Sequence, residues 1–369
     1  MKHKESIILI LSVILVLVIS GCTSNSTATN SGTSGQGSGA PAPEESSSTT
    51  TQEEDSKKAE QTITLKLSHI GNTEEIKQDV ALKMAELVEQ KTGGTLKIDV
   101  YPSGQLAKDA PTAYRSLSSG LIDLTIESLG FAAGLEKDLN ILDAKLPIVS
   151  TPEEILQVAN SKPLIEVYER FRERHGIRVL STEYLRPERI IWTKEKLETA
   201  DDIKGVKIRT PESEVFVQAV TAYGGTPIAV PWTETYTALS QGLADGVEAT
   251  MVNFLAQKFY EVIQYGSNLQ TSPGNVIGIT VSEKTWQKLS PSQQQALQEA
   301  ADESGIMGRE MELSEMKEMK QKLVELGVTF TEVDASGFQE TLNKMPYTLE
   351  EKGIWSEGLY DAIKADLGM

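Results

Sequence analysis

Arg209 ends a short strand-like run, Val206 to Arg209, and is followed by Thr210 and by Pro211, which opens a helical pattern. A planar guanidinium binds a carboxylate through two parallel hydrogen bonds. An arginine in such a place either forms a surface salt bridge, which is the commoner outcome, or holds an acidic ligand. The segment therefore suggests, as one hypothesis, a binding site for a small organic carboxylate.

Further candidate ligand residues lie around Arg209 in the chain. Arg189 begins the preceding strand-like run, and Trp232 and Tyr236 flank the start of a helical pattern. Large aromatic side chains at such positions either line a pocket or fill a core. Glu248 follows the turn Asp245-Gly246, and Asn253 comes soon after it. Glu248 could contact a ligand hydroxyl or orient Arg209, and the residues alone favour neither.

Candidates from the first part of the folded chain stand at the ends of strand-like runs. His69 ends the first run, Glu127 and Ser128 end the third, and Phe131 follows shortly after. In open α/β sheets, ligands bind outside the carboxyl ends of the strands. A single histidine is more often structural than ligand-binding. Glu127 would suit a ligand hydroxyl or amine, or else it points away from the site.

These residues belong to an alternating pattern of elements. Strand-like runs at 62–69, 96–101 and 121–127 enclose helical patterns at 74–91 and 111–119, which is typical of an α/β fold with a largely parallel sheet. A single long helix is expected at 152–175, and another follows Ser290 and Pro291, at about 292–326. Strands at 177–182, 189–193, 276–281 and 328–333 return after long helical excursions, and 338–367 is mostly helical. This order predicts two lobes with a cleft between them.

The composition excludes several classes of protein. The formal net charge is -18, which argues against a nucleic-acid partner because phosphate binding needs clustered positive charge. Three histidines and one cysteine leave little for a metal centre, and we expect no metal and no cofactor. The single cysteine, Cys22, lies before the folded body, so neither a disulfide framework nor a thiol nucleophile is expected.

The first sixty residues are expected to be a targeting signal and a tether. Lys2 and Lys4 precede an apolar run that is too short for a membrane span and ends in Ile19-Ser20-Gly21-Cys22. This resembles a bacterial lipobox, whose cysteine becomes lipidated; the alternatives are a plain signal peptide or a short membrane anchor. We expect a signal peptide at 1–21 and a lipidated Cys22 heading a disordered tether at 22–61. The folded part would then lie outside the cytoplasm, anchored to the cell membrane.

Several separated motifs resemble the DctP-type solute-binding proteins of TRAP transporters. They occur in the family's order and the resemblance extends from about Thr62 to the carboxyl end. The segments that carry it are Leu65–His69, Lys91–Leu106, Ser119–Leu124, Asp201–Ser213 and Glu234–Glu248.

The resemblance implies a binding protein, not an enzyme, that closes over an organic anion and delivers it to TRAP permease membrane subunits. It implies a two-lobed periplasmic-binding-protein-like α/β fold with a ligand cleft and a long helix spanning both lobes. Lobe I would comprise 62–184, completed by about 270–327; lobe II would comprise 185–269, completed by about 328–369. We expect a monomer. The alternatives are a sensory binding protein for a receptor and an extracytoplasmic enzyme acting on organic acids, although no Gly-x-Ser-x-Gly or His-Glu-x-x-His motif is present.

The resemblance also assigns roles. The Lys-Ile-Arg-Thr-Pro match makes Arg209 the carboxylate clamp. A second ligand arginine often lies near Arg189, but the spacing here is about one residue off, and Arg186 is nearby. The family often has an aromatic near Trp232. Where it usually has a polar residue after the glutamate, this chain has Ala249, which weakens the expectation of a ligand contact there.

Overall fold

The computed structural model describes residues 62–369. The expected signal peptide, Cys22 and the tether lie outside the described residues. The chain divides into two units, Met1–Ser56 and Lys57–Met369, and every described residue belongs to the second. Within the described part, no helix is both long and apolar enough to cross a membrane.

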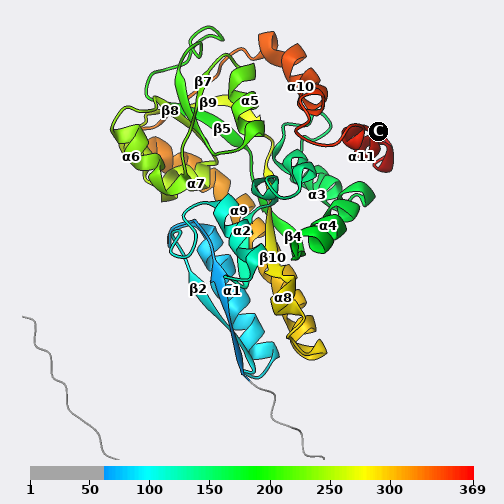
Figure 1. Cartoon of the computed structure of the whole chain (residues 1–369). Helices are drawn as coiled ribbons and strands as arrows, with labels where there is room; N and C mark the ends of the chain where they lie inside the picture. Colours follow the sequence, from blue (N-terminus) through cyan, green and yellow to red (C-terminus); the bar gives the residue numbers. More distant parts are fainter. Residues whose placement is uncertain (1–61) are drawn as a thin grey trace, which may run out of the picture. The chain divides into compact units, whose positions relative to one another are not determined.

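Lobe I is built on a five-stranded sheet (Figure 1). Strand β1 is parallel to both β2 and β3, and β10 runs antiparallel to both β3 and β4. The strands in spatial order are β2 (Leu96–Tyr101), β1 (Ile63–Ser68), β3 (Leu124–Ser128), β10 (Asn275–Ser282) and β4 (Ile177–Arg186). The associated helices are α1 (Ile76–Lys91), α2 (Ala110–Ser119), α3 (Pro152–Ala159), α4 (Lys162–His175) and α8 (Glu283–Trp286).

Lobe II is built on a six-stranded mixed sheet. In spatial order its strands are β11 (Thr329–Thr331), β9 (Tyr265–Ser272), β5 (Arg189–Thr193), β8 (Gly246–Ala249), β6 (Lys207–Thr210) and β7 (Thr226–Ala229). The helices of this part are α5 (Glu214–Ala222), α6 (Thr235–Ser240), α7 (Met251–Ala256) and α10 (Gln339–Glu351). Helix α11 (Leu359–Asp366) returns to pack against α4. Short 3-10 turns lie at Leu129–Ala132, Lys137–Asp143, Trp232–Glu234, Phe259–Glu261 and Ser336–Phe338.

The chain passes between the two sheets three times. It leaves lobe I between β4 and β5, returns between β9 and β10, and leaves again through α9 (Pro291–Glu325), drawn in gold to orange in Figure 1. Helix α9 starts in a capping box, in which Ser290 and Gln293 bond each other's backbone. Gly308 lets this helix pack closely, because a Cβ there would lie 2.5 Å from Val80 Cγ2.

The single helix expected at 152–175 is wrong, because the chain forms α3 and α4 with a break at Asn160 and Ser161. Pro163 has no N–H to donate to the carbonyl of Ala159, and it takes the second position of α4 instead. The hydroxyl of Tyr168 donates to the Ala159 carbonyl at 2.9 Å and so replaces the missing helical bond.

Three apolar clusters hold the sheets in place, and one of them packs α3, α4, α5, α10 and α11 against strands of both sheets. In lobe I, buried residues of β1, β3 and β10 pack under α1 and the first half of α9. In lobe II, Trp192 stacks on Phe254 with ring centroids 3.9 Å apart, and its Nε1 donates to the carbonyl of Ala249 at 2.9 Å. Ala249 is therefore a core residue at this sheet, and a polar side chain there would lie among apolar neighbours.

Candidate ligand-binding site

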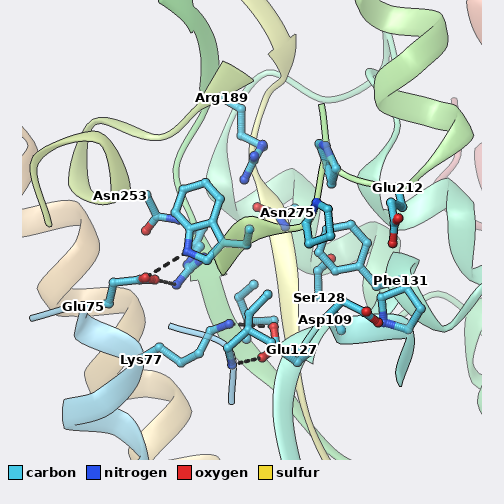
Figure 2. Close-up of a pocket in the computed structure, with 18 of the residues that line it drawn as sticks. Glu75, Lys77, Asp109, Glu127, Ser128, Phe131, Arg189, Glu212, Asn253 and Asn275 are labelled. Carbon is cyan, nitrogen blue, oxygen red and sulfur yellow. Dashed lines mark hydrogen bonds and ion pairs between the residues drawn. The ribbon is translucent and has the colours of Figure 1, made fainter. Parts of the chain in front are cut away.

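A cavity of about 600 Å³, which includes its opening to solvent, lies where the carboxyl ends of lobe I strands meet the elements of lobe II. Figure 2 shows the lining side chains converging from both lobes. Those from lobe I and its connections are Ile70, Glu75, Lys77, Asp109, Ala110, Pro111, Glu127, Ser128, Phe131, Arg186, Asn275 and Ile277. Those from lobe II are Arg189, Arg209, Pro211, Glu212, Pro231, Trp232 and Asn253.

Arg209 is a buried cation whose guanidinium is only partly bonded. Strand β6 presents it near its carboxyl end, and Nε and Nη2 both donate to the carbonyl of Val230, at 2.9 and 2.6 Å. Its third nitrogen, Nη1, is buried with no hydrogen-bond partner. The guanidinium carbon lies 5.3 Å from the ring centroid of Trp232, within cation–π range. Burial lowers the pKa of Arg209 to about 9, although the Glu248 carboxylate opposes this. A ligand anion would compensate this desolvated charge.

Arg189 also lines the cavity, but its charge is neutralised by a buried partner. Its Nε and Nη2 donate to the two carboxylate oxygens of Glu248 at 2.6 and 2.7 Å, a bidentate pair. Glu248 is fully buried, accepts a further hydrogen bond from Thr271 Oγ1, and is not among the lining residues. The carboxylate of Glu248 binds Arg189 and makes no hydrogen bond to Arg209, and a contact of Glu248 with a ligand hydroxyl stays a prediction.

A second buried ion pair forms the floor on the lobe I side. Lys77, in the first turn of α1, donates from Nζ to Glu127 Oε2 at 2.7 Å, and both side chains are almost inaccessible to solvent. The other Glu127 oxygen accepts from the backbone N–H of Ile70 at 2.7 Å. Burial lowers the pKa of Lys77, which Glu127 opposes. Lys77 was not expected from the sequence, because a lysine beside an amphipathic helix stripe normally indicates a solvated face.

Glu75 links the two lobes at the edge of the cavity. Its Oε1 accepts from Trp232 Nε1 at 3.1 Å and from Gln257 Nε2 at 2.8 Å, and both donors follow lobe II strands. Its Oε2 accepts from Arg186 Nη2 at 3.1 Å. Burial acts to raise the pKa of Glu75, but Arg186 and Lys77 outweigh it and the pKa is lowered. The carboxylate is therefore held in its charged form by lobe I cations, and two of its hydrogen bonds come from lobe II.

Arg186 has a second acidic neighbour on α9. Its Nε lies 3.4 Å from Glu312 Oε1, which also accepts from the hydroxyl of Tyr184 at 3.0 Å. Burial raises the pKa of Glu312 to about 7, and Arg186 and Tyr184 counteract it. Burial also opposes the charge on Arg186, yet the neighbouring Tyr184, Glu75 and Glu312 raise its pKa above the ordinary value.

Neutral polar groups complete the lining. The side-chain carbonyl oxygens of Asn253 and Asn275 are buried with no hydrogen-bond partner. Ser128 donates from Oγ to Asp143 Oδ1 at 2.5 Å. Burial raises the pKa of Asp143 to about 6, although the Ser128 bond counteracts it. Asn275 was not expected from the sequence, where it is one residue before an apolar run.

Of the remaining residues expected at the site, Phe131 lines the cavity, whereas His69 and Tyr236 do not. Phe131 lines the cavity with its ring 6.3 Å from that of Phe216. His69 is buried but does not line the cavity; its Nε2 bonds Gln78 Oε1 at 2.8 Å, and burial lowers its pKa to about 4. Tyr236 is 37% exposed and donates to Glu261 Oε2, away from the cavity. Across residues 62–369, no cluster of three His, Cys, Asp or Glu side chains could hold a metal ion.

The presence of a cavity between two lobes agrees with the family of proteins to which the chain is similar. Residues 67–351 match the family described as bacterial extracellular solute-binding protein, family 7, or DctP. The chain belongs to this family. Its relatives are solute-binding proteins and not enzymes, and they work outside the cytoplasm.

Individual relatives of this family 7 protein cover most of its folded part. A solute-binding protein of Roseobacter denitrificans is 28% identical over 281 residues, 76% of this chain and 84% of that protein. A TRAP periplasmic solute-binding protein of Ochrobacterium anthropi, solved with bound L-fuconate, is 30% identical with a TM-score of 0.75 over 83% of this chain and 99% of that chain. One from Desulfovibrio salexigens, solved in complex with diglycerolphosphate, is 26% identical with a TM-score of 0.76 over 83% and 97%. The two-lobed binding-protein fold is thus shared with solved proteins.

Proposed function

We propose that this family 7 protein captures a small organic carboxylate through Arg209 and delivers it to a TRAP-type membrane permease. The observation that carries the proposal is the state of Arg209. It is a desolvated cation in the lining of the cavity, and within residues 62–369 no carboxylate lies within ion-pair distance of it.

A ligand carboxylate would supply what this guanidinium lacks. Nη1 is an unused donor, and the aromatic ring of Trp232 lies beside the guanidinium. A hydrogen bond between charged groups contributes about 1.5–3 kcal/mol net. Two such bonds together with apolar burial reach the roughly 8 kcal/mol of micromolar affinity. The Val230 carbonyl fixes the guanidinium before the ligand arrives, which reduces the ordering cost of binding.

The relatives support an acidic ligand. L-Fuconate and diglycerolphosphate, the molecules bound in the two solved relatives, both carry an anionic group. In this chain the anion would lie at Arg209, and the two lobes would close around it in a hinge motion, with the ligand stabilising the closed state.

The decisive experiment identifies the ligand and then removes its clamp. Ligand retained by the purified protein is released by denaturation and identified by mass spectrometry, and a panel of organic acids is tested by calorimetry. We expect Arg209→Ala to lose at least about 100-fold in affinity, because one charge-assisted pair is removed. Arg115→Ala, which removes an exposed arginine of α2, is the control. Unchanged affinity in Arg209→Ala would overturn the proposal.

We also propose that Cys22 carries a lipid and that residues 22–61 tether the binding domain to the outer face of the cell membrane. The sequence Ile19-Ser20-Gly21-Cys22 supports this. A second acyl chain or an additional attachment makes such anchoring stable. Incorporation of labelled fatty acid into the full chain, and its loss in Cys22→Ser, tests the proposal; labelling that persists in Cys22→Ser would contradict it.

A further inference from the structure

Among the cations of the cavity lining, a single one is left without an ion-pair partner in the described part of the chain. Four cations line it: Lys77, Arg186, Arg189 and Arg209. The first three form buried ion pairs with Glu127, Glu75 and Glu248, at 2.7, 3.1 and 2.6 Å. Within the structurally described residues, Arg209 has no such partner. An anionic group of a ligand can therefore pair with Arg209 without breaking an existing ion pair.

A second anionic group would find no free cation. Apart from Arg209, each lining cation is already compensated, and the other charged groups of the wall are the carboxylates of Asp109 and Glu212. In the view of Figure 2, Asp109 and Glu127 lie on the side of the cavity away from Arg189. A second ligand carboxylate would be buried without a partner or would break an existing pair, and both carry a large desolvation cost.

The unpaired neutral atoms need hydrogen-bond donors. The side-chain carbonyl oxygens of Asn253 and Asn275 are buried acceptors without partners. An ionised carboxylate has no hydrogen to donate, whereas a hydroxyl both donates and accepts. Leaving such buried acceptors unsatisfied is costly, so hydroxyl groups on the ligand would be selected.

We infer that the ligand is a singly charged acid that carries hydroxyl groups, a sugar acid in chemical class, and that the site rejects dianions of the same skeleton. The inference rests on the proposed function, since it takes Arg209 as the anchor of the one carboxylate. It adds that the pairs Lys77–Glu127 and Arg189–Glu248 act as specificity determinants because they keep two further cations occupied.

The test compares matched ligands that differ by one charge. Five- and six-carbon aldonates are each paired with the aldarate of the same hydroxyl configuration, and hexanoate serves as the monoacid without hydroxyls. Binding to the full chain is measured by calorimetry at pH 7.5. We expect the best aldonate to bind at least about 100-fold more tightly than its aldarate, because the second carboxylate is buried unpaired. Hexanoate should bind more weakly than that aldonate by at least about tenfold.

A variant that frees a cation should relax the discrimination. In Glu127→Gln, Lys77 loses its carboxylate partner, so the aldonate-to-aldarate affinity ratio should fall by about tenfold or more. Glu283→Gln is the matched control, because it removes a carboxylate that pairs with Arg178 on β4 instead of with a lining residue. Its ratio should equal that of the wild type. If Glu127→Gln does not fold, as judged by circular dichroism, the wild-type ratio alone decides.

The outcomes separate this inference from the proposed function. If aldarates bind as tightly as aldonates and Arg209→Ala abolishes both, the single-charge inference is overturned while the proposed function stands. If no organic acid binds, both are overturned.

Discussion

The indole Nε1 of Trp232, on lobe II, donates a hydrogen bond to the buried carboxylate of Glu75, on lobe I, at 3.1 Å. The same ring covers the guanidinium of Arg209, the proposed ligand anchor. We call the hydrogen bond from Trp232 to Glu75 the latch between the lobes, so one side chain contacts both the anchor and the other half of the latch. Closure and ligand binding are therefore physically connected through Trp232.

We predict that Trp232→Phe weakens ligand binding without removing the aromatic wall. The hydrogen bond to a charged group is worth about 1.5–3 kcal/mol, and it is formed only with the lobes together. The affinity for the retained ligand should fall by about tenfold or more. Calorimetry measures this, and small-angle scattering of the ligand-free variant should show a larger radius of gyration than the wild type.

Tyr236→Phe provides the control for this latch. It also removes one hydrogen-bonding group from an aromatic side chain of lobe II, but its hydroxyl contacts Glu261 outside the cavity. Equal effects of Trp232→Phe and Tyr236→Phe would contradict a latch at Glu75.

Arg189→Met should act on stability more than on binding. The substitution leaves the buried carboxylate of Glu248 without its bidentate partner, which typically costs about 3–5 kcal/mol in the free energy of unfolding. The double variant Arg189→Met with Glu248→Gln should recover part of that loss. Urea unfolding of the single and double variants measures both values. A stable Arg189→Met protein with abolished binding would show instead that Arg189 holds the ligand directly.

The stability of the folded part should fall as the pH rises through the range in which Glu312 titrates. Its folded-state pKa is raised to about 7, from an ordinary value of 4.5, because the carboxyl is buried and lies near the carboxylate of Glu75, and these effects outweigh the opposing influence of Arg186 and Tyr184. Between these values the folded protein holds a proton that the unfolded chain has released, so the free energy of unfolding declines with increasing pH.

In Glu312→Gln this contribution is absent, and the difference in unfolding free energy between wild type and variant should change with pH between about 4.5 and 7. Urea titrations at several pH values measure it. The comparison of two proteins cancels the other titrating groups, including His69, whose pKa is lowered. A pH-independent difference would refute the prediction.

Gly308→Ala should destabilise the packing of α9. The added methyl would lie 2.5 Å from Val80 Cγ2 and 3.0 Å from Tyr184 Cδ2, and overpacking of this kind costs about 1–3 kcal/mol. Gly134→Ala is the control, since a Cβ there meets nothing within 4 Å. Thermal unfolding distinguishes the two, and equal melting temperatures would show that α9 shifts freely.

Local pattern predicted much of the fold because strands and helices have clear periods. The alternation at 62–69 and the capping signal at Ser290 and Pro291 led to β1 and α9. The split between α3 and α4 was missed since the apolar spacing continues across it, while the break depends on Pro163 and on the tertiary bond from Tyr168.

Less of the site could be predicted from the sequence, because its electrostatics depend on ion pairs and hydrogen bonds between residues far apart in the chain. Arg209 and Arg189 are both arginines at strand positions, and only the structure shows that one is bonded to Glu248 while the other keeps a free nitrogen. Lys77 meets Glu127, fifty residues away, and Glu75 meets Trp232 at 157 residues' separation. No pattern within either segment indicates these contacts.

The two strand crossings next to the cavity have a consequence for how such a protein diversifies. Residues 187–274 leave β4 and return to β10 as one uninterrupted insertion, and they carry Arg189, Arg209, Trp232 and Asn253. Exchange of this one piece of gene, with joints beside Arg186 and Asn275, would transplant nearly the whole lobe II wall of the site in a single recombination event. Lobe I, with Lys77 and Glu127, would remain as the constant half of a modular receptor.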